Sequence, residues 1–80
     1  MKISKLKELL EHGHEFEFDY KGKRYSLTWS DVKDGVIAFC EFYKDDIESE
    51  DIDEILNSTY NGMKVADIIE ELDEKEVDIF

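Results

Sequence analysis

The chain has 80 residues, of which 22 are acidic and 10 are basic, and its formal net charge is −12. This length predicts one domain, because 80 residues do not supply two hydrophobic cores. The 41% of hydrophobic residues argue against a disordered chain. The acidic balance excludes a sequence-independent grip on nucleic acid or on an anionic membrane, because each needs Lys and Arg facing phosphates.

The charge is divided unevenly along the chain. Residues 1–40 contain seven bases and seven acids, whereas residues 41–80 contain three bases and fifteen acids. The whole net charge therefore belongs to the second half, and asymmetry of this kind indicates an interaction surface. The alternative is a solvated face that only keeps the protein soluble.

The first half of the chain predicts a helix and a hairpin. Apolar residues at helical spacing predict a helix over residues 3–12. Residues 15–29 alternate between apolar and polar side chains and predict a hairpin with its turn at residues 21–22. A two-residue turn there pairs Phe18 with Tyr25, so that all the apolar side chains of the hairpin share one face.

The rest of the chain predicts one more strand, two helices and a short terminal strand. Residues 36–43 are nearly continuously apolar and extend the hairpin to a three-stranded meander. The acidic run 44–54 leads into a helix, with Ser49 as its expected N-cap. Helical spacing returns over residues 63–72, and the tail 76–80 alternates as a final strand does.

We therefore expect a single α+β domain over residues 1–80. It contains a short N-terminal helix, a three-stranded antiparallel meander, two acidic C-terminal helices and a short final strand. One face of the meander is expected to pack against the helices. The expected core is Leu6, Leu10, Phe16, Phe18, Leu27, Trp29, Ile37, Phe39, Ile55, Ile68 and Leu72.

Catalysis, cofactors and metals find little support in the sequence. Cys40 lies inside an apolar strand, where a small buried thiol is the usual outcome, and a single cysteine forms no internal disulfide. His12, His14 and Glu15 are too few converging ligands for a metal site. Motifs that cradle phosphates or dinucleotides are absent. The sequence thus predicts a protein that is not an enzyme and holds no cofactor or metal.

The remaining candidate site is the acidic run, which presents a field of negative charge comparable to that of DNA. Its expected partner is a protein with a basic surface, such as a nucleic-acid-binding protein, rather than nucleic acid or membrane itself. The alternative is a structural or homodimeric module that uses an apolar patch or a sheet edge, so that monomer and homodimer both stay open. The predicted partner-binding residues are Asp45, Asp46, Glu48, Glu50, Asp51, Asp53 and Glu54.

The expected location is the cytoplasm. No apolar run approaches the roughly 18 residues that span a bilayer. The N-terminal segment is amphipathic and carries glutamates, which is not the pattern of a signal peptide.

Two stretches resemble known small proteins. Residues 15–27 (EFEFDYKGKRYSL) and residues 61–69 (NGMKVADII) resemble small uncharacterised proteins of Gram-positive bacteria and their prophages. In size and acidity the chain is similar to anti-CRISPR proteins and other phage-encoded DNA mimics. That likeness implies an inhibitor that occupies the basic nucleic-acid-binding surface of a partner protein.

Overall fold

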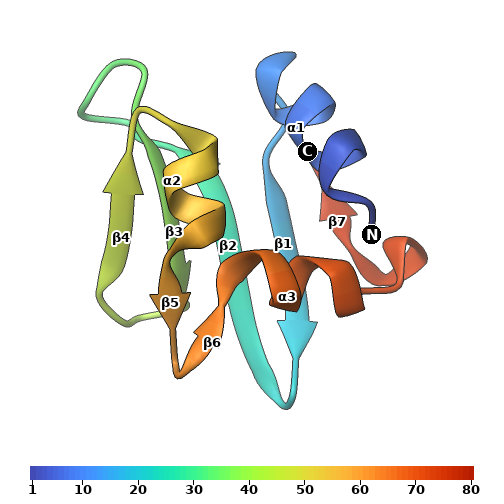
Figure 1. The fold of residues 1–80 in the computed structure, drawn as a ribbon. Helices are drawn as coiled ribbons and strands as arrows, with labels where there is room; N and C mark the ends of the chain where they lie inside the picture. The colour runs from blue at the N-terminus through green and yellow to red at the C-terminus, as the bar shows by residue number, and fades with distance from the viewer.

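Three helices pack against one face of an antiparallel sheet in the computed structural model, which describes residues 1–80 (Figure 1). The helices are α1 (Ile3–Glu11), α2 (Ile52–Asn57) and α3 (Val65–Glu71). The sheet has the order β4-β3-β2-β1-β7, and its strands are β1 (Phe16–Tyr20), β2 (Lys23–Trp29), β3 (Ile37–Glu41), β4 (Asp46–Ser49) and β7 (Asp78–Ile79). The smaller elements are the hairpin of β5 (Thr59–Tyr60) and β6 (Met63–Lys64) and the 3-10 helix η1 (Glu74–Glu76).

The predicted register of the first hairpin is confirmed. Phe18 pairs with Tyr25 across β1 and β2, and the apolar side chains of both strands face the helices. Lys21 and Gly22 both have positive φ, +49° and +78°, as both central residues of a type I′ turn must. Gly22 adopts this conformation without a steric penalty, whereas Lys21 does not.

The α+β class is confirmed, but the three-stranded meander is wrong, because β4 adds a fourth strand to it. β4 pairs antiparallel with β3, so that Ile47 lies opposite the buried Phe39. Packing against the core therefore makes a strand of residues that the sequence assigned to an acidic loop. The N-cap of α2 is Asp51 and not Ser49, because the Asp51 side chain accepts a hydrogen bond from the backbone N–H of Asp53.

The two acidic helices are present but shorter than expected, and a hairpin separates them. Asn61 and Gly62 have φ values of +50° and +80° and turn the chain from β5 to β6. α3 therefore begins at Val65 instead of residue 63. The final strand is confirmed as β7, which pairs antiparallel with β1 and places Ile79 opposite Phe16.

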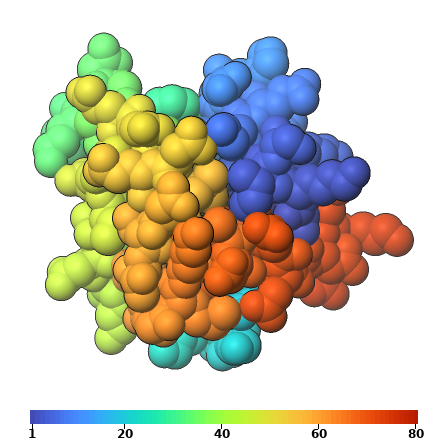
Figure 2. Space-filling model, viewed as in Figure 1, coloured from blue at the N-terminus to red at the C-terminus, as the bar shows by residue number.

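The core lies between the sheet and the helices. Nine of the eleven expected core residues are buried there, while Trp29 and Leu72 are only partly buried at its edge. Six further buried residues lie outside the expected core list: Tyr20, Tyr25, Leu56, Val65, Ile69 and Val77. Figure 2 shows α1, α2 and α3 side by side over this core, whereas no helix covers the other face of the sheet. No helix combines the length and the apolar surface that crossing a bilayer requires.

Trp29 leads to the first prediction. Its indole N–H is buried and has no hydrogen-bond acceptor, which is unfavourable by about 1–3 kcal/mol. Trp29→Phe removes this donor and keeps an aromatic ring, so we expect a free energy of unfolding within about 1 kcal/mol of the wild type, or above it. Urea denaturation measures this change, with Trp29→Ala as the comparison that also loses the ring. A loss of more than about 2 kcal/mol in Trp29→Phe would contradict the prediction.

Candidate functional site

The structure divides the predicted acidic site between two parts of the fold. Asp45 and the β4 residues Asp46 and Glu48 lie at the edge of the sheet, whereas Asp53 and Glu54 belong to α2. Glu50 and Asp51 form the link between these two elements. All seven carboxylates are exposed. Helical spacing would place Glu50, Asp53 and Glu54 on one outward face, but Glu50 lies outside α2.

Three of the seven acids have partners within the chain. Asp51 caps α2, and Asp53 lies 3.0 Å from the Lys7 ammonium. Glu48 lies 2.9 Å from the Lys33 ammonium. The hydrogen bonds that the two ammonium groups donate to Asp53 and Glu48, together with the charge of these carboxylates, raise the pKa of both lysines above the ordinary value. The acids with neither an ion pair nor a capping role are Asp45, Asp46, Glu50 and Glu54.

An exposed aromatic turn joins β3 to β4, and we call residues 42–45 the Tyr43 tip. The unpaired Asp45 is its last residue, and the unpaired Asp46 follows it. The Tyr43 side chain is 100% exposed, and its backbone φ is +67°. The Lys44 N–H donates to the Glu41 carbonyl oxygen (3.1 Å), which closes the turn. The ring of Phe42 lies edge-on to that of Tyr43, with 6.1 Å between centroids.

No separate signal in the amino-acid pattern marks this tip. Residues 36–43 form one apolar run, so Tyr43 was assigned to the strand, although β3 ends at Glu41. Turns that need a positive φ at their third residue usually place Gly or Asn there. Tyr43 at this position is an exception that only the structure reveals.

Tyr60 holds the tip in place from the β5–β6 hairpin. Its hydroxyl accepts a hydrogen bond from the Glu41 N–H (3.0 Å) and donates one to the Asp45 carbonyl oxygen (2.6 Å). Its ring packs edge-on against Phe39, with 5.4 Å between centroids. The two ends of the tip are thus fixed to the core, and the exposure of Tyr43 does not result from a loose loop.

Tyr20 and Tyr60 make the stability of the fold sensitive to alkaline pH. Burial raises the pKa of both tyrosines above the ordinary value of 10.0, and a hydrogen bond to Glu71 adds to this effect at Tyr20. Both hydroxyls are neutral below about pH 10 in the folded and the unfolded chain, so their contribution is fully present there. Above this pH the unfolded chain ionises first, and the contribution is lost as the pH rises through the folded pKa.

We therefore expect the free energy of unfolding to fall above about pH 10, and to fall less in the Tyr20→Phe/Tyr60→Phe variant. Urea denaturation at a series of pH values measures both slopes. Tyr43→Phe serves as the control, because this change alters a fully exposed ring. Equal slopes in the double variant and the wild type would contradict the assignment.

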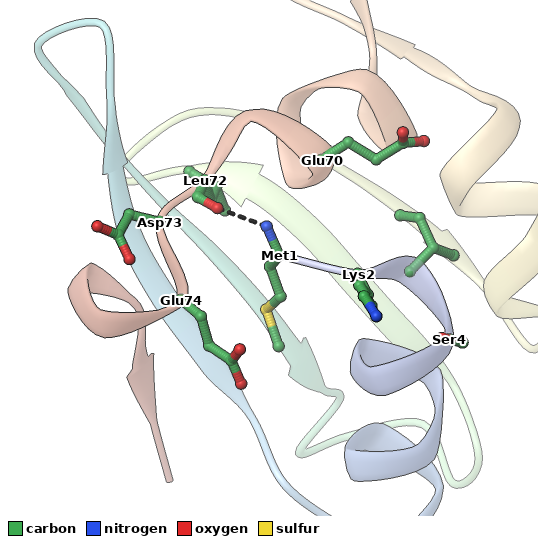
Figure 3. A pocket seen from close by; sticks show the side chains of 8 residues that line it. Met1, Lys2, Ser4, Glu70, Leu72, Asp73 and Glu74 are labelled. Carbon is green, nitrogen blue, oxygen red and sulfur yellow. Dashed lines mark hydrogen bonds between the residues drawn. The ribbon is translucent and has the colours of Figure 1, made fainter.

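A second group of acids lines a hollow beside Met1, as Figure 3 shows. An open hollow of about 620 Å³ is lined by Met1, Lys2, Glu70, Asp73 and Glu74, among others. The Met1 ammonium donates to the carbonyl oxygens of Leu72 and, at 3.3 Å, of Ile69 at the end of α3. A cation at a helix C-terminus is favourable, so this charge stabilises the fold.

The cysteine and histidines are not assembled into a reactive group. Cys40 lies on the sheet face without helices, and its Sγ is 3.5 Å from the Ser26 hydroxyl. Nδ1 of His12 lies 2.8 Å from the Glu8 carbonyl oxygen, while Nδ1 of His14 lies 2.8 Å from that of Phe80. No three side chains of His, Cys, Asp or Glu converge on a point where a metal ion would bind.

Comparison with known protein families, with curated proteins and with solved structures finds no match to this chain.

Proposed function

We propose that this protein is a binding module that docks onto a basic surface of a partner protein through the Tyr43 tip. The further contacts are the four unpaired acids, of which Asp45 and Asp46 adjoin Tyr43, whereas Glu50 follows the opposite end of β4 and Glu54 lies in α2. The partner class that suits this surface best is a nucleic-acid-binding protein, whose phosphate-binding groove the acids would occupy in place of DNA or RNA. In that role the protein is a stoichiometric inhibitor or regulator.

The conformation and exposure of Tyr43 carry this proposal. A left-handed backbone costs an L-residue roughly 1–2 kcal/mol, and Gly or Asn avoids most of that cost. The fold gains no burial from the Tyr43 side chain, which is 100% exposed. A strained and exposed tyrosine on a rigid turn is explained by an interface, where Tyr is among the residues that contribute most binding energy.

The unpaired acids supply the complementary charge. Ion pairs in the chain involve only seven of the 22 carboxylates, which are Glu17, Asp19, Glu41, Glu48, Asp53, Glu74 and Asp78. The four acids Asp45, Asp46, Glu50 and Glu54 are among the fifteen that remain. Charges at the rim of an interface mainly raise the association rate and make it depend on salt.

The test begins with a pull-down at low and high salt to obtain the partner. Its association and dissociation rates are then measured with two variants of the full chain. Tyr43→Asn should bind about tenfold more weakly, mainly through faster dissociation, and should fold at least as well as the wild type because Asn tolerates a positive φ. The variant D45N/D46N/E50Q/E54Q should associate about tenfold more slowly.

A matched variant separates the surface from the overall charge. E8Q/E11Q/D31N/D34N removes the same number of charges from exposed positions that form no ion pair and lie outside the tip. It should associate at close to the wild-type rate. If Tyr43→Asn and the tip variant bind as the wild type does, or if both charge variants lose affinity equally, the proposal is wrong.

A homodimer through the sheet edge is the second candidate, because the outer edge of β4 has no neighbouring strand. Antiparallel pairing of two β4 strands would bring Asp46 and Glu48 of one copy beside those of the other. Like charges across paired strands are destabilising. We therefore favour a monomer, and a mass near 9.5 kDa by light scattering distinguishes it from a dimer.

A further inference from the structure

A cavity of about 240 Å³ lies between the β1–β2 turn and the β5–β6 hairpin, at the lower end of the molecule in Figure 1. Its wall is mainly apolar and includes the rings of Tyr20 and Tyr25 and the side chains of Met63 and Ile68. The volume equals that of roughly eight water molecules. It lies somewhat below the roughly 300–1,000 Å³ of pockets for drug-sized ligands, so it suits a smaller molecule.

The Tyr25 hydroxyl brings an unused hydrogen-bond donor to this cavity. Tyr25 is only 3% exposed, and its oxygen accepts a hydrogen bond from the Asn61 amide (3.0 Å). No group of the chain accepts the Tyr25 proton. The neighbouring Tyr20 hydroxyl, in contrast, donates to a Glu71 oxygen at 2.8 Å. A buried donor without an acceptor is unfavourable, and a ligand with an acceptor oxygen would satisfy it.

Lys21 and Lys23 supply positive charge at the rim. The Lys21 ammonium forms no ion pair and lies 5.3 Å from the centroid of the Tyr20 ring. The Lys23 ammonium is 3.9 Å from a carboxylate oxygen of Glu41, and that same oxygen accepts a hydrogen bond from the Asn61 amide at 3.0 Å. Glu41 is thus already paired with Lys23 and hydrogen-bonded to Asn61, whereas Lys21 has no anionic partner.

The backbone of Lys21 adds an independent observation. Its φ of +49° nearly equals the +50° of Asn61, which fills the corresponding position of the β5–β6 turn. Asn is a preferred residue at that position and Lys is not. Lys21 thus has a strained backbone conformation beside the cavity, whereas Asn61 adopts nearly the same φ in the β5–β6 turn with less strain.

We propose that this cavity binds a small carboxylate whose body is apolar, such as an aromatic or branched-chain acid. The apolar body occupies the wall formed by Met63 and Ile68. The carboxylate accepts the proton of the Tyr25 hydroxyl and pairs with the ammonium of Lys21. This site goes beyond the proposed protein-binding function and does not depend on it.

Two-dimensional NMR titration of the full chain with phenylacetate tests the site. The isosteric phenylacetamide is the neutral control, and inorganic phosphate is the control for charge alone. Phenylacetate should shift amide signals of residues 20–25 and 60–63 in a saturable way, with at least fivefold tighter binding than either control. Equal binding of the amide, or shifts spread over the whole molecule, would overturn the proposal.

A pair of variants examines the lysines. K21N/K23Q should retain the fold, because Asn suits the turn, and should bind phenylacetate at least fivefold more weakly. K2Q/K75Q removes the same charge from residues outside the cavity and should bind as the wild type does. Unchanged binding by K21N/K23Q would overturn the role of these residues. Tyr43→Asn should bind phenylacetate normally, so a failure here is distinguishable from a failure of the protein-binding proposal.

Discussion

Phe39→Ala is expected to lower the free energy of unfolding by about 3–5 kcal/mol, the usual loss for a large aromatic residue in a core. Phe39 is 0% exposed and lies in the middle of β3. Its ring stacks on Tyr25, with 5.7 Å between centroids, and meets the edge of Tyr60 at 5.4 Å. The substitution therefore removes buried area and leaves a cavity beneath two neighbouring rings.

This loss is large in relation to the whole fold. Domains are stabilised by roughly 0.05–0.15 kcal/mol per residue, which gives about 4–12 kcal/mol for a chain of this size. At the lower end of that range a substantial fraction of Phe39→Ala molecules would be unfolded at room temperature. Urea denaturation followed by circular dichroism measures the change.

Two comparisons make the Phe39 experiment specific. Val32→Ala shortens a side chain that is 92% exposed and should change stability by less than about 0.5 kcal/mol. Phe39→Leu fills part of the space and should recover part of the loss. If Phe39→Ala costs less than about 1.5 kcal/mol, the centre of β3 does not form the core described here.

The elements that the sequence predicted well are those whose pattern is local. The β1–β2 register follows from the alternation on both sides of residues 21–22, because only one pairing puts every apolar side chain on the same face. Alternation of apolar and polar residues also predicts the final strand, which pairs with β1. In both cases the alternation of the side chains predicts the strands, although β7 pairs with β1 from the other end of the chain.

β4 is absent from the sequence prediction because its composition is typical of a loop, although its partner strand β3 directly precedes it in the chain. The segment has only one large apolar residue, Ile47, and its acids are typical of a loop or of a helix start. The alternation of residues 46–49 is visible in the sequence, but the contact of Ile47 with the sheet becomes decisive only once Phe39 lies opposite. Because the sequence prediction contains no β4, it begins the helix earlier and takes Ser49 as the N-cap. In the structure Asp51 has this role.

In the candidate site, the sequence alone does not show which acids form ion pairs. Counting along the chain placed all the net charge in the second half. In space, α1 brings Lys5 to Glu74 and Lys7 to Asp53, so part of the acidic half is neutralised by the other half. Which acids stay unpaired is a tertiary property, and the exposure of Tyr43 is another, because a solvent-exposed aromatic looks like a core residue in sequence.

Arg24→Met is expected to loosen β7 from the sheet, because Arg24 joins carboxylates from two other strands. Its guanidinium lies 3.3 Å from Glu17 and 3.4 Å from Asp19 on β1, and it also pairs with Asp78 on β7. The hydrogen bond to Asp78 is the main reason that the pKa of Arg24 is raised. β7 has only two residues, so few other contacts hold it.

Without the arginine, these three acids repel one another on the open face of the sheet. The amide protons of Glu15 and Phe80, which bond reciprocally between the end of the chain and the start of β1, should exchange about tenfold faster in Arg24→Met. Added salt should slow this exchange towards the wild-type rate, because screening weakens repulsion between exposed charges.

Arg24→Lys decides whether geometry or charge alone holds β7. A lysine keeps the charge but lacks the planar fork that reaches several carboxylates at once, so we expect it to restore only part of the protection. Full restoration by lysine would mean that a point charge suffices. Exchange at Glu15 and Phe80 that is equally slow in all three proteins would show that backbone pairing with β1 holds β7 without Arg24.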